Sequence, residues 1–327
     1  MRNLTAILII TSLLFLGCKK DKQIDNIPFN PFDDLIEGES QFFDLDTVSL
    51  KEITGKYGTK IYFERSFFDV DELEKITLEL KEFYKLRDLI KNNIRTITNE
   101  NELLESSGVI YLDFKKNGVS IDLKDSVNIN LRFPKELSNR DKLFIGEIDS
   151  IGQTSWMELE TKVSFMKFNI KWQIDELFET TLDSLPYYQD LWKKQDSILS
   201  ELEDNYNEID SKLNPIFSIN KLGWINIDKF VESTFLKNID LEITTGVDGL
   251  VVYFIYPTLN SFNSYYPQEV DKISLKKVPI VDKTNIIIVG QKNNILYAKK
   301  IELGENYKIK TELKEISLNK LEKLLSE

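Results

Sequence analysis

The chain has 327 residues, with 42 Lys and Arg against 54 Asp and Glu, one Cys and no His. A net charge of −12 repels phosphate backbones, so we expect no nucleic-acid partner. The absence of His excludes Ser–His–Asp and Cys–His nucleophilic sites and His-ligated zinc, so any enzyme here would have to use carboxylates, Lys, Tyr or Ser.

The first residues, MRNLTAILIITSLLFLGCKKDK, have the organisation of a secretory signal. Arg2 gives a positive start, and an apolar run without charge extends from Leu4 to Gly17. That run is shorter than the about 20 residues that a membrane-spanning helix needs. It ends at Cys18, the only Cys in the chain, and FLGC resembles the bacterial lipobox. We therefore predict a signal peptide at residues 1–17 and lipidation of Cys18.

Lipidation of Cys18 would make the lipid bilayer a partner, since several acyl chains anchor a protein stably. Lys19 stands where an Asp would retain a lipoprotein at the inner membrane, so we expect an anchor in the outer membrane of the cell envelope. The residues after the Cys also resemble a surface-export signal, and both the surface-exposed and the periplasm-facing positions stay open. Residues 18–40 mix charge, Pro and Gly without a period, which is typical of a flexible tether.

Residues 41–135 are predicted to form a first, sandwich-like β domain. Apolar and polar residues alternate in ITLELKEF, GVIYLDF and SVNINLRFP, a pattern of antiparallel strands with one solvated face. Between the first two, YKLRDLIKNN has the apolar spacing of a short helix.

Residues 136–221 are predicted to form a connecting segment of mixed strand and helix. Between residues 187 and 213, apolar positions mostly three or four apart form an a/d seam of about three heptads. One amphipathic helix packed on its own domain is favoured over a dimerising coiled coil, because so few heptads are marginal for an isolated coil.

Residues 222–327 are predicted to form a second antiparallel β domain with a C-terminal helix. The continuous apolar runs 250–255 and 286–289 indicate central strands buried on both faces. The last residues, SLNKLEKLLSE, place four Leu on one helical stripe. The predicted fold is therefore mainly β, with two sandwich-like domains.

The stretch LGWINIDKF contains the structural landmarks Gly223, Trp224, Asn226 and Asp228. We expect it to be the strand that opens the second domain, with Gly223 permitting a bend. Trp224 and Ile227 should be mostly buried. Asn226 and Asp228 should satisfy backbone groups at a turn, and Asp228 should lie outside any pocket ringed by other acids.

The two Asp-x-Asp pairs, in FFDLD (42–46) and FFDVD (67–71), are the candidate metal ligands. Closely spaced carboxylates can ligate calcium, but neither pair has the Gly and distal Glu of an EF-hand loop. We expect the Phe residues in the core, the Asp residues facing water, and no cofactor, with calcium as the alternative.

Six ordered motifs resemble a family of Bacteroidota lipoproteins over about residues 41–325. In chain order they are ITGKYGTKIYFERSFF, ITLELKEFYKLRDLI, IRTITNENELLESSGVIYLDF, VNINLRFP, LFIGEIDSIGQTSWMEL and KLGWINIDKF. The resemblance implies a first domain distantly related to the β-sandwich of ankyrins, netrin receptors and tight-junction scaffolds, but no transferable activity. Relatives often read GWINCDRF, so Ile227 replaces a Cys, which predicts a buried packing position.

These observations favour a non-catalytic, lipid-anchored envelope protein that presents β modules to another envelope protein or a glycan. One alternative is an accessory glycan- or nutrient-binding lipoprotein beside an outer-membrane transporter. It requires exposed aromatic side chains, and the candidates are Tyr187, Tyr188, Trp192, Tyr265 and Tyr266. The other is a hydrolase with two facing carboxylates in a deep cleft.

Overall fold

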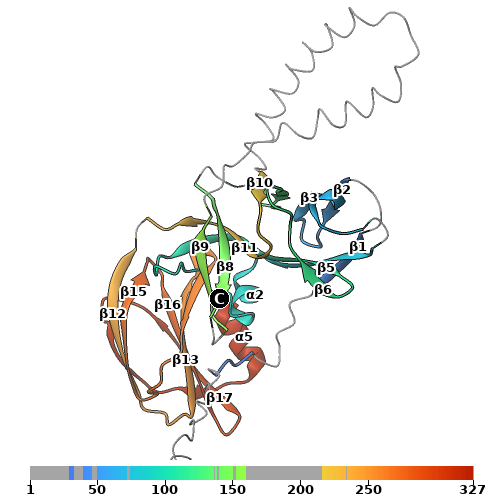
Figure 1. Ribbon diagram of the computed structural model, residues 1–327. Helices are drawn as coiled ribbons and strands as arrows, with labels where there is room; N and C mark the ends of the chain where they lie inside the picture. Colours follow the sequence, from blue (N-terminus) through green and yellow to red (C-terminus); the bar gives the residue numbers. More distant parts are fainter. Residues whose placement is uncertain are drawn as a thin grey trace, which may run out of the picture.

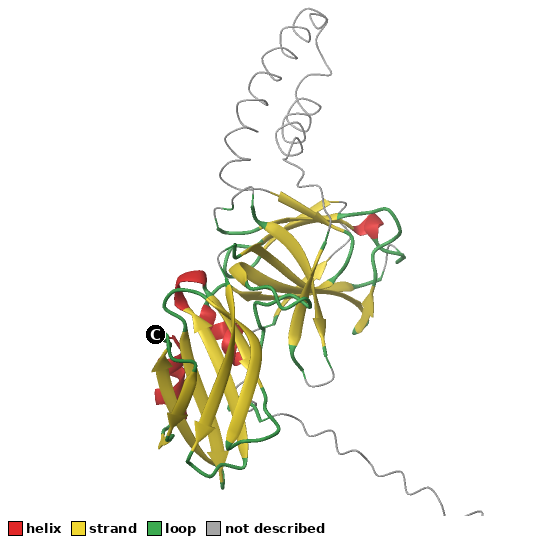
Figure 2. Cartoon of the chain, turned by 90° about the vertical axis from the view of Figure 1, so that its left-hand side faces the viewer, coloured by secondary structure: helices red, strands yellow, loops and turns green. Residues whose placement is uncertain are grey.

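The computed structural model shows a mainly β protein built as two neighbouring β units, each with two sheets (Figures 1 and 2). It describes residues 29–32, 40–45, 50–71, 74–135, 137, 140–149, 152–159, 216–232 and 234–326. Cys18, the signal peptide, most of the tether and the helix expected at 187–213 lie outside these residues. Within them, no helix is long and apolar enough to cross a membrane.

The first unit has one sheet of seven strands and one of four. The larger has the order β1-β4-β5-β11-β8-β9, with β6 also paired to β5, and the smaller has the order β10-β7-β3-β2. The bounds of the larger are β1 Gln41–Leu45, β4 Ile76–Phe83, β5 Leu104–Lys116, β6 Val119–Ile121, β8 Lys142–Ile148, β9 Thr154–Glu158 and β11 Gly223–Phe230. Those of the smaller are β2 Leu50–Thr54, β3 Lys60–Glu64, β7 Ile129–Arg132 and β10 Ile216–Ile219, and a 3₁₀ turn, η2 Arg65–Phe67, follows β3. Ile61 and Leu131 of the smaller sheet share a core with Leu78 and Leu112 of the larger, so the two sheets pack face to face.

The second unit packs a sheet of three strands on a sheet of five. Their orders are β15-β12-β18 and β14-β13-β16-β17-β19. The bounds are β12 Phe235–Ile243, β13 Gly249–Tyr256, η3 Pro257–Leu259, β14 Ser261–Tyr265, β15 Lys272–Ile280, β16 Asn285–Lys292, β17 Ile295–Glu302, β18 Lys308–Thr311 and β19 Lys314–Glu315. The pair β12–β18 is parallel, which alternation does not reveal, whereas the other paired strands are antiparallel.

The prediction that runs 250–255 and 286–289 are buried on both faces is confirmed. They lie in β13 and β16, at the centre of the five-stranded sheet. One face packs on the three-stranded sheet, and the other on a core that includes α2 Leu86–Lys91 and α5 Leu318–Ser326. Both helices were expected, and Leu321 and Leu325 of α5 are buried in that core.

The expectation that LGWINIDKF opens the second domain is wrong. Strand β11 lies inside the seven-stranded sheet, antiparallel to β5 on one side and to β8 on the other. Strands β8, β9 and β10, from the segment expected to be a connection, also belong to the sheets of the first unit. Alternation locates a strand and its faces but carries no information about which distant strand it pairs with, so the sequence pattern placed β11 in the wrong unit.

The two units join at the start of β5. The Thr96 hydroxyl donates to the Phe262 carbonyl at 3.0 Å and accepts from the Phe262 amide at 2.9 Å. Asn260, at the end of η3, donates through its side-chain nitrogen to the Ser106 carbonyl at 3.3 Å. Apolar residues of both units, among them Leu104 and Tyr253, share one core beneath these contacts.

Replacing Thr96 by Val should lower the free energy of unfolding by about 1–3 kcal/mol, because the buried Phe262 amide loses its acceptor. Chemical denaturation measures the change. Thr77→Val is the matched control: its hydroxyl donates to Asp44 at the exposed edge of the sheet, so its loss should cost less than about 1 kcal/mol. Equal losses for the two variants would contradict a hydrogen-bonded junction at Thr96.

Candidate functional site

The middle of strand β11 is the most completely buried part of the landmark sequence. The four residues Ile225 to Asp228 have no exposed surface. Ile225 and Ile227 point into the core between the sheets of the first unit, so the predicted packing role of Ile227 is confirmed. Trp224 is partly exposed but keeps most of its surface buried, as predicted, and its ring lies 5.7 Å from that of Phe83.

A β-bulge in β5 explains why an Asp stands inside this sheet. Opposite β11 the register skips Ser107, because Ile227 faces Gly108 and Asp228 faces Ser106. The amide of the skipped Ser107 donates to Asp228 Oδ1 at 3.0 Å. Asp228 therefore satisfies a backbone group, as predicted, but at a bulge in the neighbouring strand and not at a turn.

The Asp228 carboxylate is surrounded mainly by neutral donors. Asn226 donates from Nδ2 to Asp228 Oδ2 at 2.6 Å. Nearby, the Ser107 hydroxyl donates to Asp141 at 2.8 Å, and Lys135 donates to the Ser106 carbonyl at 3.4 Å. Asp141 is thus a single acid beside Asp228, and one acid does not make a pocket ringed by acids.

The pKa of Asp228 is raised to about 7, chiefly by burial and to a lesser extent by the neighbouring Asp141 carboxylate, while the hydrogen bonds from Asn226, Ser107 and Ser106 act to lower it. Burial likewise lowers the pKa of Lys135, against the pull of Asp228 and Asp141. A carboxyl that titrates near neutrality suits proton transfer. Because Asp228 has no exposed surface, its proton can act on the fold but does not face a dissolved substrate.

A second buried carboxylate, that of Glu82, organises the loop between β2 and β3. It accepts hydrogen bonds from the amides of Tyr57 and Thr59, each at 3.0 Å, and from the Gln41 side chain at 2.8 Å. A Cβ on Gly55 would lie 2.5 Å from Glu82 Oε2, so only Gly permits this approach. The sequence held a signal that we missed: Glu82 follows Ile76, Leu78 and Leu80 on the core-facing side of the alternation.

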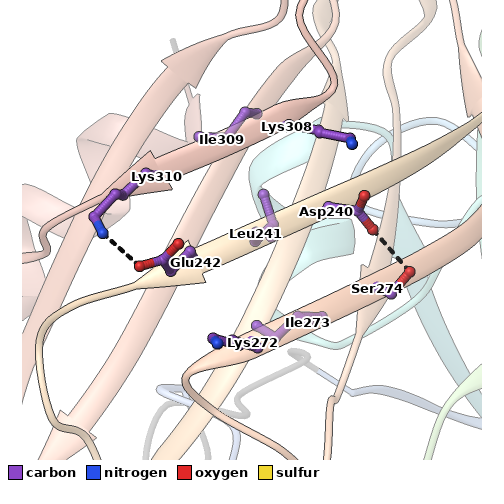
Figure 3. Close-up of a pocket in the computed structure, with 9 residues that line it drawn as sticks. All are labelled: Asp240, Leu241, Glu242, Lys272, Ile273, Ser274, Lys308, Ile309 and Lys310. Carbon is purple, nitrogen blue, oxygen red and sulfur yellow. Dashed lines mark hydrogen bonds and ion pairs between the residues drawn. The ribbon is translucent and has the colours of Figure 1, made fainter.

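The outer face of the three-stranded sheet carries an open groove of about 460 Å³ (Figure 3). Its floor is the central strand β12, whose Asp240 and Glu242 point outward. The groove is lined by Asp240, Leu241, Glu242, Lys272, Ile273, Ser274, Lys308, Ile309 and Lys310.

Charges in this groove alternate across the three strands. The hydroxyl of Ser274 donates to Asp240 at 2.8 Å, and Lys310 donates to Glu242. Lys272 stands opposite Glu242 on β15, and Lys308 stands opposite Asp240 on β18. Three Lys thus face two carboxylates, and each carboxylate already accepts a hydrogen bond, so the groove offers donors to an anionic ligand.

The Lys side chains of the groove favour the ionised form of Glu242. The hydrogen bond from Lys310 lowers the pKa of Glu242, and Lys272 lowers it further, whereas the general acid of a carboxylate hydrolase needs a raised pKa.

The aromatic platform expected for a glycan-binding accessory protein is not formed by Tyr265 and Tyr266. The Tyr265 ring packs on Phe254 at 5.5 Å, and its hydroxyl accepts a hydrogen bond from Asn263. The Tyr266 hydroxyl donates to Asn93 at 3.1 Å, and its ring borders the shared core. Tyr187, Tyr188 and Trp192 lie outside the described residues.

The Asp-x-Asp pairs behave largely as expected. Phe68 is buried, and Asp69 and Asp71 face water. Phe42 departs from the expectation, because it is 62% exposed on the edge strand β1. In the described ranges, no group of three or more acidic side chains or Cys is placed to hold a metal ion.

No protein-family model, curated protein or solved structure matches the chain, so the resemblance to Bacteroidota lipoproteins stays a prediction from its motifs.

The bulge at Gly108 gives a sharp test of this site. Gly108 has φ of +153°, and a Cβ there would lie 2.3 Å from Tyr84 Cε1. Gly223 has φ of +102°, and nothing lies within 4 Å of its Cβ position. Both Ala variants carry backbone strain, but only Gly108→Ala adds overpacking, which costs about 1–3 kcal/mol.

We therefore expect Gly108→Ala to lower the free energy of unfolding by at least about 1 kcal/mol more than Gly223→Ala does. Denaturant titration of both variants measures the difference. The close approach of Tyr84 to the bulge would be refuted by two variants of equal stability.

Proposed function

We propose that the chain is a non-catalytic, lipid-anchored protein of the cell envelope that presents its β units to another envelope protein or a glycan. The anchor rests on one observation, the position of the only Cys directly after an uncharged apolar run. Acyl chains on Cys18 would hold the protein at the outer membrane, with residues after the Cys serving as the tether.

The groove of the three-stranded sheet is the proposed contact surface. Its side chains come from three neighbouring strands, and the opposite face of the same sheet is occupied by core residues such as Ile239 and Ile243. The outer face is thus open to a partner along the length of three strands.

The charge distribution supports an anionic partner. Residues 272–326 contain 12 Lys and 6 Asp or Glu, an excess of six positive charges in a chain whose net charge is −12. Such local asymmetry attracts a partner of opposite sign, and the attraction weakens as salt screens it. A carboxylate-bearing glycan or an acidic protein face has this chemistry.

Replacing Cys18 by Ala should move the protein from the membrane fraction to the soluble fraction, because the acyl chains are lost. Fractionation followed by detection of a C-terminal tag measures the change. A variant that still sediments with membranes would contradict the anchor, and protease treatment of intact cells would show which way the protein faces.

Affinity capture of the tagged, lipidated protein from its native envelope tests the contact surface. The double change Lys272→Glu and Lys308→Glu should abolish recovery of the partner, because the groove then repels anions. The double change Lys320→Glu and Lys323→Glu on α5 alters net charge equally and should leave recovery intact.

If both double variants recover the partner equally, the groove is not the contact surface. Recovery of an outer-membrane transporter would favour the accessory uptake role over the general one.

A further inference from the structure

Asp228 is a carboxyl group with no exposed surface inside the seven-stranded sheet. Its hydrogen-bond donors, the Asn226 amide and the Ser107 backbone, are both neutral. Within the described ranges it forms no ion pair, and the Nζ atom of nearby Lys135 donates to a backbone carbonyl instead. An unpaired charge with no exposed surface is costly, so the neutral acid is the form that this site favours.

The charged and titratable groups around Asp228 come from four elements. Glu105 of β5 pairs with Lys229 of β11 at 2.9 Å, and so these two largely neutralise each other. Asp141 precedes β8 and adds a second negative charge, whereas Lys135 follows β7 and adds a positive one. The charges around Asp228 therefore nearly cancel, and none of these groups forms an ion pair with its carboxylate.

The location of Asp228 couples it to the junction of the two units. Its acceptor oxygen holds the bulged Ser107 amide, and the carbonyl of Ser106, one residue earlier, accepts from Asn260 of the second unit. Asn226, on the same strand, is buried with its Oδ1 acceptor unpartnered, and the nearby Ser106 hydroxyl acts to lower the pKa of Asp228.

We propose that Asp228 is a proton-binding switch: it is neutral in the folded protein at mildly acidic pH, and its ionisation at alkaline pH places an unpaired charge beside the bulge and destabilises the folded protein. This device acts independently of the contact surface proposed above. The contribution of Asp228 to stability is therefore greatest at acidic pH.

The direction of the pH dependence of stability follows from the difference in proton binding between the folded and the unfolded protein. Burial raises the pKa of Asp228 from its usual 3.8 to about 7, so between these values the folded protein holds a proton that the unfolded chain releases. The stability from this group is fully present below about pH 4 and is lost as the pH rises through about 7. Carboxylates whose pKa is lowered on folding have the opposite dependence, so only a comparison with a variant isolates Asp228.

Asp228→Asn is the informative variant, because an amide keeps the acceptor oxygen for Ser107 and cannot ionise. Unfolding of the full-length protein in detergent should be measured at pH 5.5 and pH 8.0. Over this interval the unfolding constant of the wild type should rise roughly thirtyfold more than that of Asp228→Asn. The exposed variant Asp240→Asn should retain the wild-type dependence.

A spectroscopic measurement keeps the test independent of variant folding. The infrared spectrum of the wild type, minus that of Asp228→Asn, should contain the C=O stretch of a protonated carboxyl at pH 5.5, and the band should vanish by about pH 8. If Asp228→Asn does not fold, the test is whether this band of the wild type is present at pH 5.5 and disappears by about pH 8. Equal pH dependence of the wild type and Asp228→Asn, or no such band at pH 5.5, would overturn the proposal.

Discussion

The structure depends on the rule that a backbone amide removed from water must find an acceptor inside the protein. In the middle of the largest sheet, the bulged Ser107 amide of β5 finds its acceptor in Asp228 of β11. An unsatisfied buried group costs about 1–3 kcal/mol, a large part of the about 5–15 kcal/mol by which a folded protein is stable. Glu82 solves the same problem for the loop before β3, and Thr96 solves it for β14.

These buried polar groups determine how the two units are arranged. The larger sheet of the first unit packs on the smaller sheet with one face, while residues of its other face, such as Phe144 and Trp156, enter the core shared with the second unit. The five-stranded sheet is covered on both sides as well, by that shared core and by the three-stranded sheet. The outer face of the three-stranded sheet, in contrast, is not covered by any of the residues that the structure describes, and this is why the binding proposal rests on it.

The sequence predicts local elements well and distant pairing poorly. Period-2 alternation located β4, and the continuous apolar runs identified the central strands β13 and β16. The expectation that Ile227 occupies a buried packing position is confirmed. The neighbours of β11, however, lie more than 60 residues away in the chain, and no local pattern records them.

The candidate site was predicted in part. Polar residues on a core-facing side, Asn226 and Asp228 in β11 and Glu82 in β4, are visible as breaks in the apolar pattern. Their partners are not visible, because the skipped Ser107 and the exposed groove charges arise only when strands far apart in sequence come into register. The same limitation hid the parallel pairing of β18.

Hydrogen exchange at the Ser107 amide tests the central claim most directly. If Asp228 holds this amide as an integral part of the sheet, Ser107 should exchange only when the whole unit unfolds, with the protection of the neighbouring core amide of Ile110. Exchange of Ser107 through a local opening, at a free energy far below that of Ile110, would contradict the account.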